Sequence, residues 1–172
     1  KLRTSYGLVG SDVAMGRRYL YNQVYEKGSG YNFGDYETEN FPGYREGALG
    51  NDHVTWEKAK KFDIGIDLNL FNRISLTFDY FYDKRYDQLV YRNDVPMLLG
   101  IGTSPENIAK TSNQGFDGQL SYHDKWGDFQ FNTNFVFSYA KNKIIYEAEA
   151  QQIYPWLAAT GHPIGQPFGY KW

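Results

Sequence analysis

Residues 62–82 read FDIGIDLNLFNRISLTFDYFY and contain two runs in which apolar and polar side chains alternate. Every even-numbered residue from Phe62 to Leu70 is apolar, and so is every even-numbered residue from Ile74 to Tyr82. An alternation with a period of two places these apolar side chains on one face of an extended strand. We therefore predict two neighbouring β-strands, each with one apolar and one polar face.

A three-residue connection, Phe71-Asn72-Arg73, separates the two runs and determines how they pair. Directly opposed side chains of an antiparallel pair point to the same face, so folding about Asn72 keeps all the large apolar residues together. Asn72 also tolerates the left-handed conformation that such turns often need. The predicted hairpin opposes Leu70 with Ile74, Leu68 with Leu76, Ile66 with Phe78 and Ile64 with Tyr80.

The apolar face of this hairpin needs a partner, which is either lipid or a second sheet. A transmembrane strand has roughly nine to eleven residues, whereas strands of soluble domains more often have about five or six. The two runs have the transmembrane length, and carboxylates lie on their opposite face. We predict an outer-membrane barrel whose watery lumen is lined by Asp63, Asp67, Asp79 and Asp117. There the favoured role of the carboxylates is to solvate the wall and pack against a plug; the alternatives are pairing with basic residues of neighbouring strands and screening of solutes.

The composition favours β structure and excludes several other classes of protein. Aromatic residues make up 19% of the 172 residues, as is typical of strands and of the aromatic belts of membrane barrels. A net charge of −2 provides no basic stripe for nucleic acid. The chain has no Cys for disulfide or thiol chemistry, and no run approaches the roughly eighteen apolar residues of a membrane helix.

The whole chain alternates strands with connections of two lengths. Strands are predicted at about 2–10, 56–70, 74–90, 115–122 and 129–146. Short turns lie at residues 71–73 and 125–127, and a long connection without predicted strands runs from Ser11 to about Val54. Alternate connections of up-and-down strands lie at opposite ends, so all the long loops share one end. That sidedness is typical of a transporter barrel, with short turns in the periplasm and long loops outside.

The last two predicted strands pair through a turn within residues 123–128. Their parity allows Leu120 opposite Phe131 and Phe116 opposite Phe135. Five strands cannot close a membrane barrel, whose smallest form has about eight. The chain starts inside a predicted strand and stops in a Gly- and Pro-rich stretch. We therefore expect a piece of a longer protein.

Seven short motifs, in the family's order along the chain, resemble SusC-type TonB-dependent transporters. They are SYGLVGS at 5–11, TWEKAKKFDIGIDLNLF at 55–71, DYFYDKRYDQLV at 79–90, the Val95-Pro96 step, NQGFDGQLSY at 113–122, FSYAKNKI at 137–144 and TGHPIGQPFGY at 160–170. Two details depart from the family's pattern. The family usually has a longer, Asn-rich turn where Phe71-Asn72-Arg73 stands, and usually has Glu at the position of Asp117. Neither departure affects the expected fold.

The resemblance implies a multi-pass transporter in the outer membrane of Bacteroidetes-type Gram-negative bacteria. Such a transporter is a barrel of about 22 strands filled by an N-terminal plug. It imports glycans, peptides or other large nutrients with energy delivered by TonB, and a SusD-like surface lipoprotein typically covers its external loops as a lid. Nothing in these residues resembles the plug or the TonB box. The implied role of this chain is therefore pore wall and external loops.

Aromatic side chains of the first long loop are the candidates for contact with cargo or lid. Aromatic residues stack on sugar rings and are the preferred anchors of interfaces. The alternative is that these side chains pack the loop against itself and anchor it at the membrane interface. The candidates are Tyr25, Tyr31, Phe33, Tyr36 and Tyr44.

The same loop presents oxygen ligands at alternate positions, in Asp35, Glu37 and Glu39, followed by Asn40. Calcium prefers such ligands, but the glycine and the remaining ligand spacing of a calcium loop are absent. A solvated acidic loop is therefore favoured. We expect no metal and no cofactor, with calcium as the one exception left open.

No pattern in the sequence predicts catalysis. Asp52-His53 and His123-Asp124 are adjacent pairs, and neighbours on a strand point to opposite faces. His162 lies in a Gly- and Pro-rich segment without a nucleophile motif. Gly100-Ile101-Gly102 lacks the strand–turn–helix context of a phosphate-binding loop. We therefore predict that the chain is not an enzyme.

Three lysines, Lys58, Lys60 and Lys61, precede the strand at 62–70. Long basic side chains can extend from an apolar surface to the water at a membrane boundary. We predict that these lysines lie at the outer interface, as does Trp56.

Together these features predict an all-β segment of a large transmembrane β-barrel, with antiparallel up-and-down strands, short turns on one side and long loops on the other. The predicted function is nutrient import by an active transporter. Two alternatives stay open: a passive porin or surface adhesin barrel, and a soluble carbohydrate-binding β-sandwich. An outer-membrane hydrolase is a weaker alternative, because no triad or metal cluster supports it.

Overall fold

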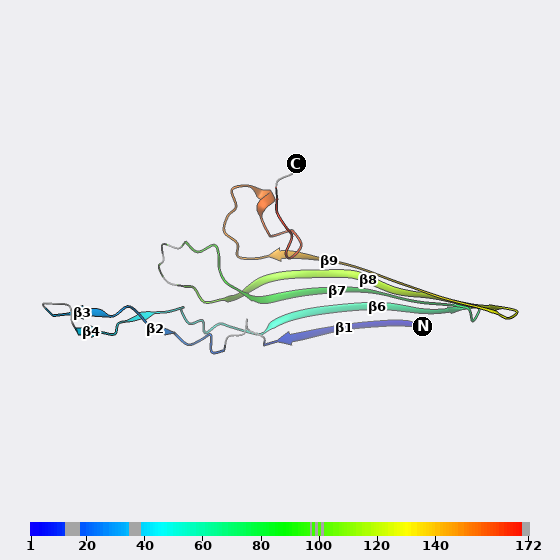
Figure 1. The fold of residues 1–172 in the computed structure, drawn as a ribbon, viewed down its shortest axis with the longest axis horizontal. Coiled ribbons are helices and arrows are strands. Elements are labelled where there is room, and N and C mark those ends of the chain that lie inside the picture. Colours follow the sequence, from blue (N-terminus) through cyan, green and yellow to red (C-terminus); the bar gives the residue numbers. More distant parts are fainter. Residues whose placement is uncertain (13–17, 35–38, 97, 99, 101, 170–172) are drawn as a thin grey trace.

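The fold is a long hairpin extended on both sides into one antiparallel sheet. The computed structural model describes residues 1–12, 18–34, 39–96, 98, 100 and 102–169. Its main sheet has five strands in the order β1-β6-β7-β8-β9, all antiparallel to their neighbours (Figure 1). The strands are β1 Leu2–Ser11, β6 Glu57–Leu70, β7 Ile74–Val90, β8 Glu106–Trp126 and β9 Phe129–Tyr146. The predicted all-β, up-and-down fold is confirmed.

Strands β6 and β7 form the predicted hairpin in the predicted register. The four predicted pairs are all present: Leu70 with Ile74, Leu68 with Leu76, Ile66 with Phe78 and Ile64 with Tyr80. Phe71 and Asn72 have φ values of 54° and 55°, and the Arg73 amide donates to the Leu70 carbonyl at 3.1 Å. The left-handed conformation predicted for Asn72 is confirmed, and it begins one residue earlier than predicted.

Strands β8 and β9 pair in a register that the sequence did not predict. Leu120 lies opposite Phe135, not Phe131, and Phe116 lies opposite Tyr139, not Phe135. Strand β8 continues to Trp126, and the turn is therefore tighter than predicted. Only residues 127 and 128 connect the two strands, and the φ of the glycine at 127 is 62°. A shift by an even number of positions preserves the face of every side chain, so the apolar face remains intact.

The first long loop contains regular structure that the sequence did not predict. Strands β2 (Tyr25–Lys27) and β5 (Tyr44–Glu46) pair with each other, and so do β3 (Tyr31–Phe33) and β4 (Glu39–Phe41). These nested pairs form an arm that projects from the sheet at the end opposite the short turns (Figure 1). The strands have only three residues each and all their residues are exposed, so they are too short for a periodic pattern to predict them.

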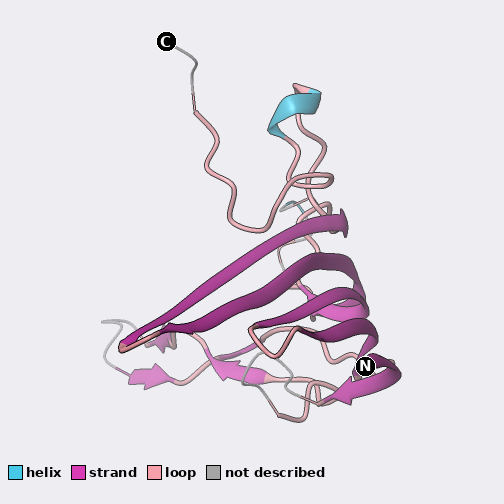
Figure 2. Ribbon diagram, turned by 90° about the vertical axis from the view of Figure 1, so that its right-hand side faces the viewer, coloured by secondary structure: helices cyan, strands magenta, loops and turns pink. Residues whose placement is uncertain are grey.

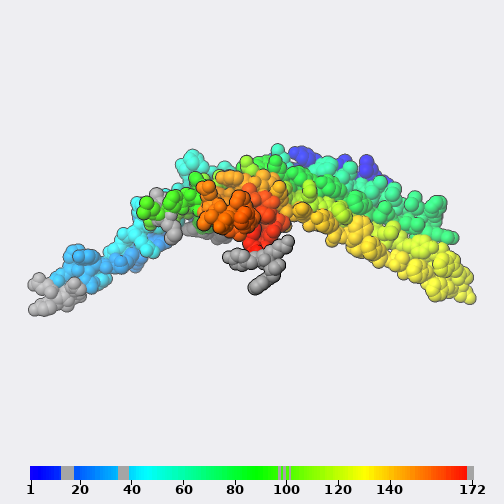
Figure 3. All heavy atoms as spheres, turned by 90° about the horizontal axis from the view of Figure 1, so that it is seen from above, coloured from blue at the N-terminus to red at the C-terminus, as the bar shows by residue number. Residues whose placement is uncertain are grey.

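The main sheet is a single curved layer (Figure 2), and the molecule as a whole is an elongated arch (Figure 3). The buried apolar side chains of the described part lie in the loops or at the long-loop end of the strands: Leu20, Leu89, Ala109, Ile144 and Ala148. Along the apolar face, in contrast, Ile64, Tyr80, Leu120 and Phe135 are 37–62% exposed. Within the described residues no second sheet covers this face, so the β-sandwich alternative is not supported. None of the described helices is long and apolar enough to span a membrane.

The segment after β9 folds back onto the long-loop end of that strand and includes the short 3-10 helix η2 (Pro155–Leu157). The Gly161 amide donates to the Ile144 carbonyl at 2.8 Å, and the Ile144 amide donates to the His162 carbonyl at 2.9 Å. The Glu149 carboxylate accepts hydrogen bonds from the amides of Ala159 at 2.7 Å and Thr160 at 2.9 Å. These bonds hold the segment as a defined loop.

The Glu149 carboxylate makes this loop sensitive to pH. The hydrogen bond to Thr160, followed by the other amide bonds and by the charge of His162, lowers the pKa of Glu149 from its ordinary value of 4.5. A lowered pKa means that the stabilisation is complete above about pH 4.5 and is lost as the pH falls through the folded-state pKa. We expect the protection of the Ala159 and Thr160 amides from hydrogen exchange to fall over that acidic range. Glu149→Gln should remove this pH dependence; if it persists in that variant, another group is responsible.

Candidate functional site

The polar face of the sheet brings the four predicted carboxylates together. Asp63 and Asp67 lie on β6 on either side of Gly65, which is paired with Asp79 of β7. Asp79 is in turn paired with Asp117 of β8. Because paired residues share a face, all four carboxylates lie on the face opposite the exposed Ile, Leu and Phe side chains.

A single arginine of β1 binds two of these carboxylates. Arg3 donates from Nε and Nη2 to the two oxygens of Asp67, at 3.0 and 3.1 Å, and from Nη2 to Asp79 Oδ2 at 2.9 Å. Arg3 is paired with Gly65, so its side chain crosses over that glycine to reach β7. A Cβ at position 65 would collide with the Asp79 carboxylate and lie 2.9 Å from Arg3 Nη2. The glycine is therefore needed for this bridge.

The remaining carboxylates leave a negative stretch beside the bridge. Asp117 lies directly opposite Asp79, and like charges in that arrangement destabilise a sheet. The Arg3 guanidinium offsets the repulsion from the Asp79 side, where the carboxylate is only 17% exposed. Within the described ranges neither Asp63 nor Asp117 has an ion-pair partner. This stretch can hold water or cationic groups.

Two of the predicted aromatic candidates form a cluster on the arm. The ring centroids of Tyr31 and Phe33 are 4.9 Å apart, and those of Phe33 and Phe41 are 5.4 Å apart. Tyr31 also lies opposite Phe41 in the β3–β4 pair. The ring contacts are tilted and edge-to-face, and they leave the three side chains 51–70% exposed, so that they present one apolar surface to the outside. Exposed aromatic side chains of this kind are enriched among the anchors of protein interfaces.

The other aromatic candidates lie apart from this cluster. Tyr25 and Tyr44 are on the β2–β5 pair, opposite Glu46 and Lys27, and are 65% and 68% exposed. No aromatic contact of either ring is found within the described part of the chain. Tyr36 lies outside the described residues.

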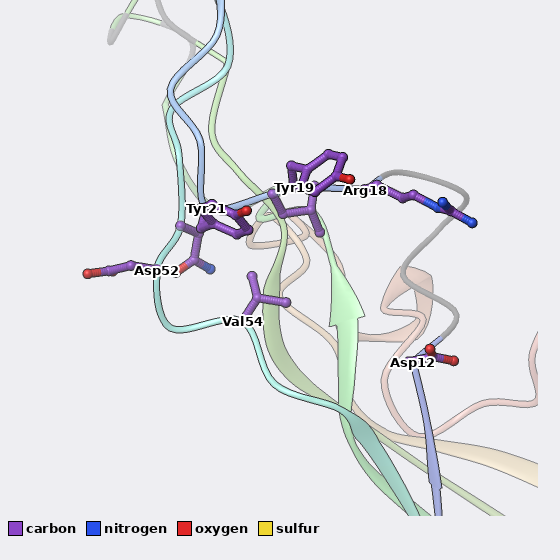
Figure 4. Close-up of a pocket in the computed structure, with 8 residues that line it drawn as sticks. Asp12, Arg18, Tyr19, Tyr21, Asp52 and Val54 are labelled. Atoms are coloured by element: carbon purple, nitrogen blue, oxygen red, sulfur yellow. The ribbon is translucent and has the colours of Figure 1, made fainter.

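A hollow of about 670 Å³ lies at the foot of the arm (Figure 4). Its lining combines apolar and charged side chains: Asp12, Arg18, Tyr19, Leu20, Tyr21, Asn51, Asp52 and Val54. The rings of Tyr19 and Tyr21 meet edge to face with centroids 6.1 Å apart. The volume falls in the range of small-molecule sites, although these are usually more enclosed.

The foot of the arm is tied to the connection between β7 and β8. Asn51 Nδ2 donates to the carbonyl of the fully buried Pro105 at 2.9 Å. The Asn107 side chain accepts from the Thr55 amide and donates to the Thr55 carbonyl, both at 2.8 Å. These bonds fix the base from which the arm projects.

The weaker predictions for metal and acid–base sites gain no support. Of the calcium candidates, Asp35 and Glu37 lie outside the described residues, and Glu39 is paired with Phe33 in the arm. The described residues contain no cluster of three or more metal-ligating side chains. His53 contacts Asp52 at 3.4 Å, with both side chains more than 80% exposed. That pair lies at the surface, without a nucleophile motif beside it.

In the second acid–imidazole pair, His123-Asp124, the carboxylate has a structural role. The Asp124 carboxylate accepts from Arg73 Nη1 at 3.1 Å and from the Tyr122 hydroxyl at 3.0 Å. Its side chain is 5% exposed, and the bonds clamp the β6–β7 turn onto β8. His123 lies on the adjacent position, paired with Asn132.

The predicted group of three lysines divides between two environments. Lys58 Nζ is 3.0 Å from Asp87 Oδ2 in an ion pair. Lys60 lies on the apolar side of the sheet, in the same parity as Phe62, whereas Lys61 lies on the polar side opposite Asp83. The predicted position of these lysines at the outer interface stays a prediction, and the pairing adds that the Lys61 side chain lies on the opposite face from Lys60.

Sequence reasoning did not single out several residues that the structure places in these sites. Arg3 reaches carboxylates more than sixty positions away, and no local pattern signals such a contact. Gly65 interrupts the polar side of an otherwise regular strand, which was a usable signal for close approach of other groups. Phe41, Tyr19 and Tyr21 resemble every other aromatic residue of a Tyr-rich loop.

An open single-layer sheet with a bare apolar face and a charged polar face is the wall of a membrane β-barrel. A sequence model described as "TonB dependent receptor-like, beta-barrel" matches residues 15–169. The chain belongs to this TonB-dependent receptor family, and the resemblance noted in the sequence is confirmed. Barrels of this family lie in the outer membrane, and its members are transport proteins rather than enzymes.

Curated relatives and solved structures agree with this assignment. The chain is 29% identical over 136 residues to TonB-dependent receptor P3 of Formosa agariphila and 28% identical over 175 residues to TonB-dependent receptor P39 of the same organism. These alignments cover 71% and 99% of this chain but only 14% and 16% of the relatives. The chain thus spans about a sixth of the length of P39 and slightly less of P3.

The fold is also similar to that of the RagAB peptide importer. The TM-score is 0.70 to the "closed-closed" state and 0.66 to the "open-open" state, with 22% and 24% identity. The superposed region covers 94% and 85% of this chain, and 18% and 15% of the importer chain. At this level of identity the likeness concerns the fold alone.

Proposed function

We propose that this chain supplies part of the pore wall and external loops of an outer-membrane transporter that imports large nutrients, glycans or peptides, into the periplasm. The observation that carries the proposal is the two-faced sheet: apolar side chains are exposed on one face and paired or free carboxylates lie on the other. In a membrane barrel the apolar face contacts lipid hydrocarbon and the polar face lines a water-filled lumen. The similar structures are those of a peptide importer, which supports peptides among the candidate cargoes.

The polar face is the proposed lumen wall, with Asp63, Asp67, Asp79 and Asp117 directed at the plug or the solute. Arg3 bridges three strands there through Asp67 and Asp79. The bridge stiffens the wall where the neighbouring carboxylates repel each other. The free carboxylates, Asp63 and Asp117, remain available to basic groups of a plug, which is the role we propose for them.

The arm is the proposed contact for a SusD-like lipoprotein lid or for cargo held beneath it. It projects from the long-loop end, which is the outer end of a barrel of this family. The surface formed by Tyr31, Phe33 and Phe41 has the aromatic composition of an interface anchor. TonB would act through a plug in another part of the receptor.

The test compares aromatic substitutions on the two strand pairs of the arm in the full-length receptor. Replacing Tyr31, Phe33 and Phe41 by Ser should lower the uptake of fluorescent tryptic peptides by cells about tenfold or more, because anchor side chains each contribute more than about 1 kcal/mol. Tyr25→Ser with Tyr44→Ser removes equally exposed rings outside the cluster and should have a smaller effect. Equal effects of the two variants, at equal receptor levels in the membrane, would contradict a localised anchor.

A passive porin has the same strand pattern and is the alternative function to test. Import of the same peptides should cease in cells that lack TonB, because an active transporter needs energy from the inner membrane. Undiminished uptake without TonB would favour the porin. The arm would then act as a selectivity element rather than as a lid contact.

A further inference from the structure

Toward the long-loop end of the apolar face, a row of lysines lies just beyond the paired aromatic residues Phe62 and Tyr82, with Tyr86 one row further out. Lys60 of β6 is paired with Lys84 of β7, Lys84 with Ser112 of β8, and Ser112 with Lys143 of β9. Lys141 lies one row below Lys143, in line with Gln114 and Tyr82. Since adjacent strands are about 4.8 Å apart, the row from Lys60 to Lys143 spans roughly 14 Å.

These four lysines have no ion-pair partner in the described part of the chain. Lys60, Lys84, Lys141 and Lys143 are all exposed. Lys58, nearby, is neutralised by Asp87 at 3.0 Å. The one contact that Lys60 makes with a ring is to Tyr86, whose centroid is 5.6 Å away. The row therefore retains its positive charge.

The strand register places two of these lysines in direct repulsion, which a bound anion would relieve. Lys60 and Lys84 lie directly opposite each other, and like charges in that position destabilise a strand pair. One residue along, on the polar face, Lys61 lies opposite Asp83 instead. At this one height, therefore, unlike charges are opposed on the polar face, Lys61 with Asp83, and like charges on the apolar face, Lys60 with Lys84.

The position of the row indicates where the anion comes from. The aromatic residues Phe62 and Tyr82 are paired immediately below it, and belts of such residues mark the boundary of the hydrocarbon. Lysine side chains just beyond this boundary reach the layer of lipid head groups. Lipid phosphates are the anions of that layer, and basic side chains at a membrane surface attract them.

We propose that Lys60, Lys84, Lys141 and Lys143 form a binding site for the phosphate groups of an outer-leaflet lipid, of the phosphorylated glycolipid class. The proposal rests on the membrane placement of the proposed function, because the row faces lipid only if the apolar face does. One phosphate lies between Lys60 and Lys84 and removes their repulsion. A second lies near Lys141 and Lys143, which are on the same face of β9.

The test uses the full-length receptor in nanodiscs of phosphatidylcholine containing a small fraction of lipid A, with bound lipid counted by native mass spectrometry. The paired variant Lys60→Gln with Lys84→Gln should bind lipid A roughly 30-fold more weakly, since each lysine near an anionic surface contributes about fivefold. Lys61→Gln is the matched control, adjacent in sequence but on the polar face, and should change binding less than twofold.

Two further measurements distinguish a lipid phosphate from a free phosphate ion, and failure of this inference from failure of the proposed function. Dephosphorylated lipid A should bind equally weakly to all variants, and inorganic phosphate should not displace lipid A; displacement would indicate a free-anion site and overturn the lipid proposal. Equal losses for Lys61→Gln and for the paired variant would also overturn it. If the receptor folds and inserts but binds lipid A no better than its dephosphorylated form, this inference fails alone. Failure to insert would instead overturn the proposed function.

Discussion

Replacing Ile66 by Arg is expected to destabilise the barrel by roughly 2–4 kcal/mol, which is the cost of Arg near the midplane of the lipid face. Ile66 belongs to the exposed apolar face and is paired with Phe78 and Leu2. No other layer of the described chain covers it, and in the proposed membrane placement lipid is the environment that the charge would enter. The measurement is the free energy of unfolding of the full-length receptor in lipid vesicles, from urea titration.

The matched control is Thr77→Arg, because Thr77 lies next to Phe78 but on the polar face, opposite Asp67. An arginine there has carboxylates and water within reach and should cost well under 2 kcal/mol. Asp67→Arg would be a poor control, since it also removes the Arg3–Asp67 ion pair. Equal penalties for Ile66→Arg and Thr77→Arg would show that the two faces do not have different solvents.

Replacing Gly115 by Ala is expected to destabilise the barrel by about 1–3 kcal/mol, as overpacking of a close contact does. A Cβ at position 115 would collide with the Tyr139 carbonyl oxygen and lie 2.7 Å from Phe81 Cζ and 2.9 Å from Ala140 Cα. Two of these atoms belong to the backbone of β9, so the β8–β9 ladder has to shift. The ring of Phe81 covers the glycine and could not stay in place either.

Gly7→Ala is the control for this substitution. Gly7 also lies within a strand of the sheet, and a Cβ there would meet nothing within 4 Å. Its replacement should be neutral or slightly stabilising, because Ala has less freedom in the unfolded chain. The same urea titration measures both variants. A Gly115→Ala receptor as stable as Gly7→Ala would be evidence against the close approach of β8 and β9 at this glycine.

The β6–β7 hairpin could be predicted completely because two independent signals agreed there. The alternation fixes the faces of Ile66 and Phe78, and the three-residue connection centred on Asn72 fixes which residues are opposed. For β8 and β9 only the first signal was available. Side-chain parity is compatible with Phe131 as well as with Phe135 opposite Leu120. The correct register depends on the position of the turn, which the polar residues at 123–125 make hard to recognise because they belong to the strand.

The site was less predictable than the sheet because its contacts connect distant residues. Asp67 and Asp79 were identified from their face, but their partner Arg3 could not be, since strand order must be known before β1 can be placed beside β6. The N-terminal half of β8 was missed for a related reason. Its residues 106–114 are mainly polar and small on both faces, so the strand is defined by pairing with β7 and β9 rather than by its own pattern.

The two outer strands of the sheet, β1 and β9, carry a wider consequence for how the cell handles this receptor. Along most of its length, each of them has backbone N–H and C=O groups that no strand of this sheet pairs on its outer side. These groups lie next to exposed apolar side chains, and the combination promotes aggregation. During biogenesis this part of the receptor would therefore be prone to aggregate in the periplasm until its outer strands were paired with neighbouring strands.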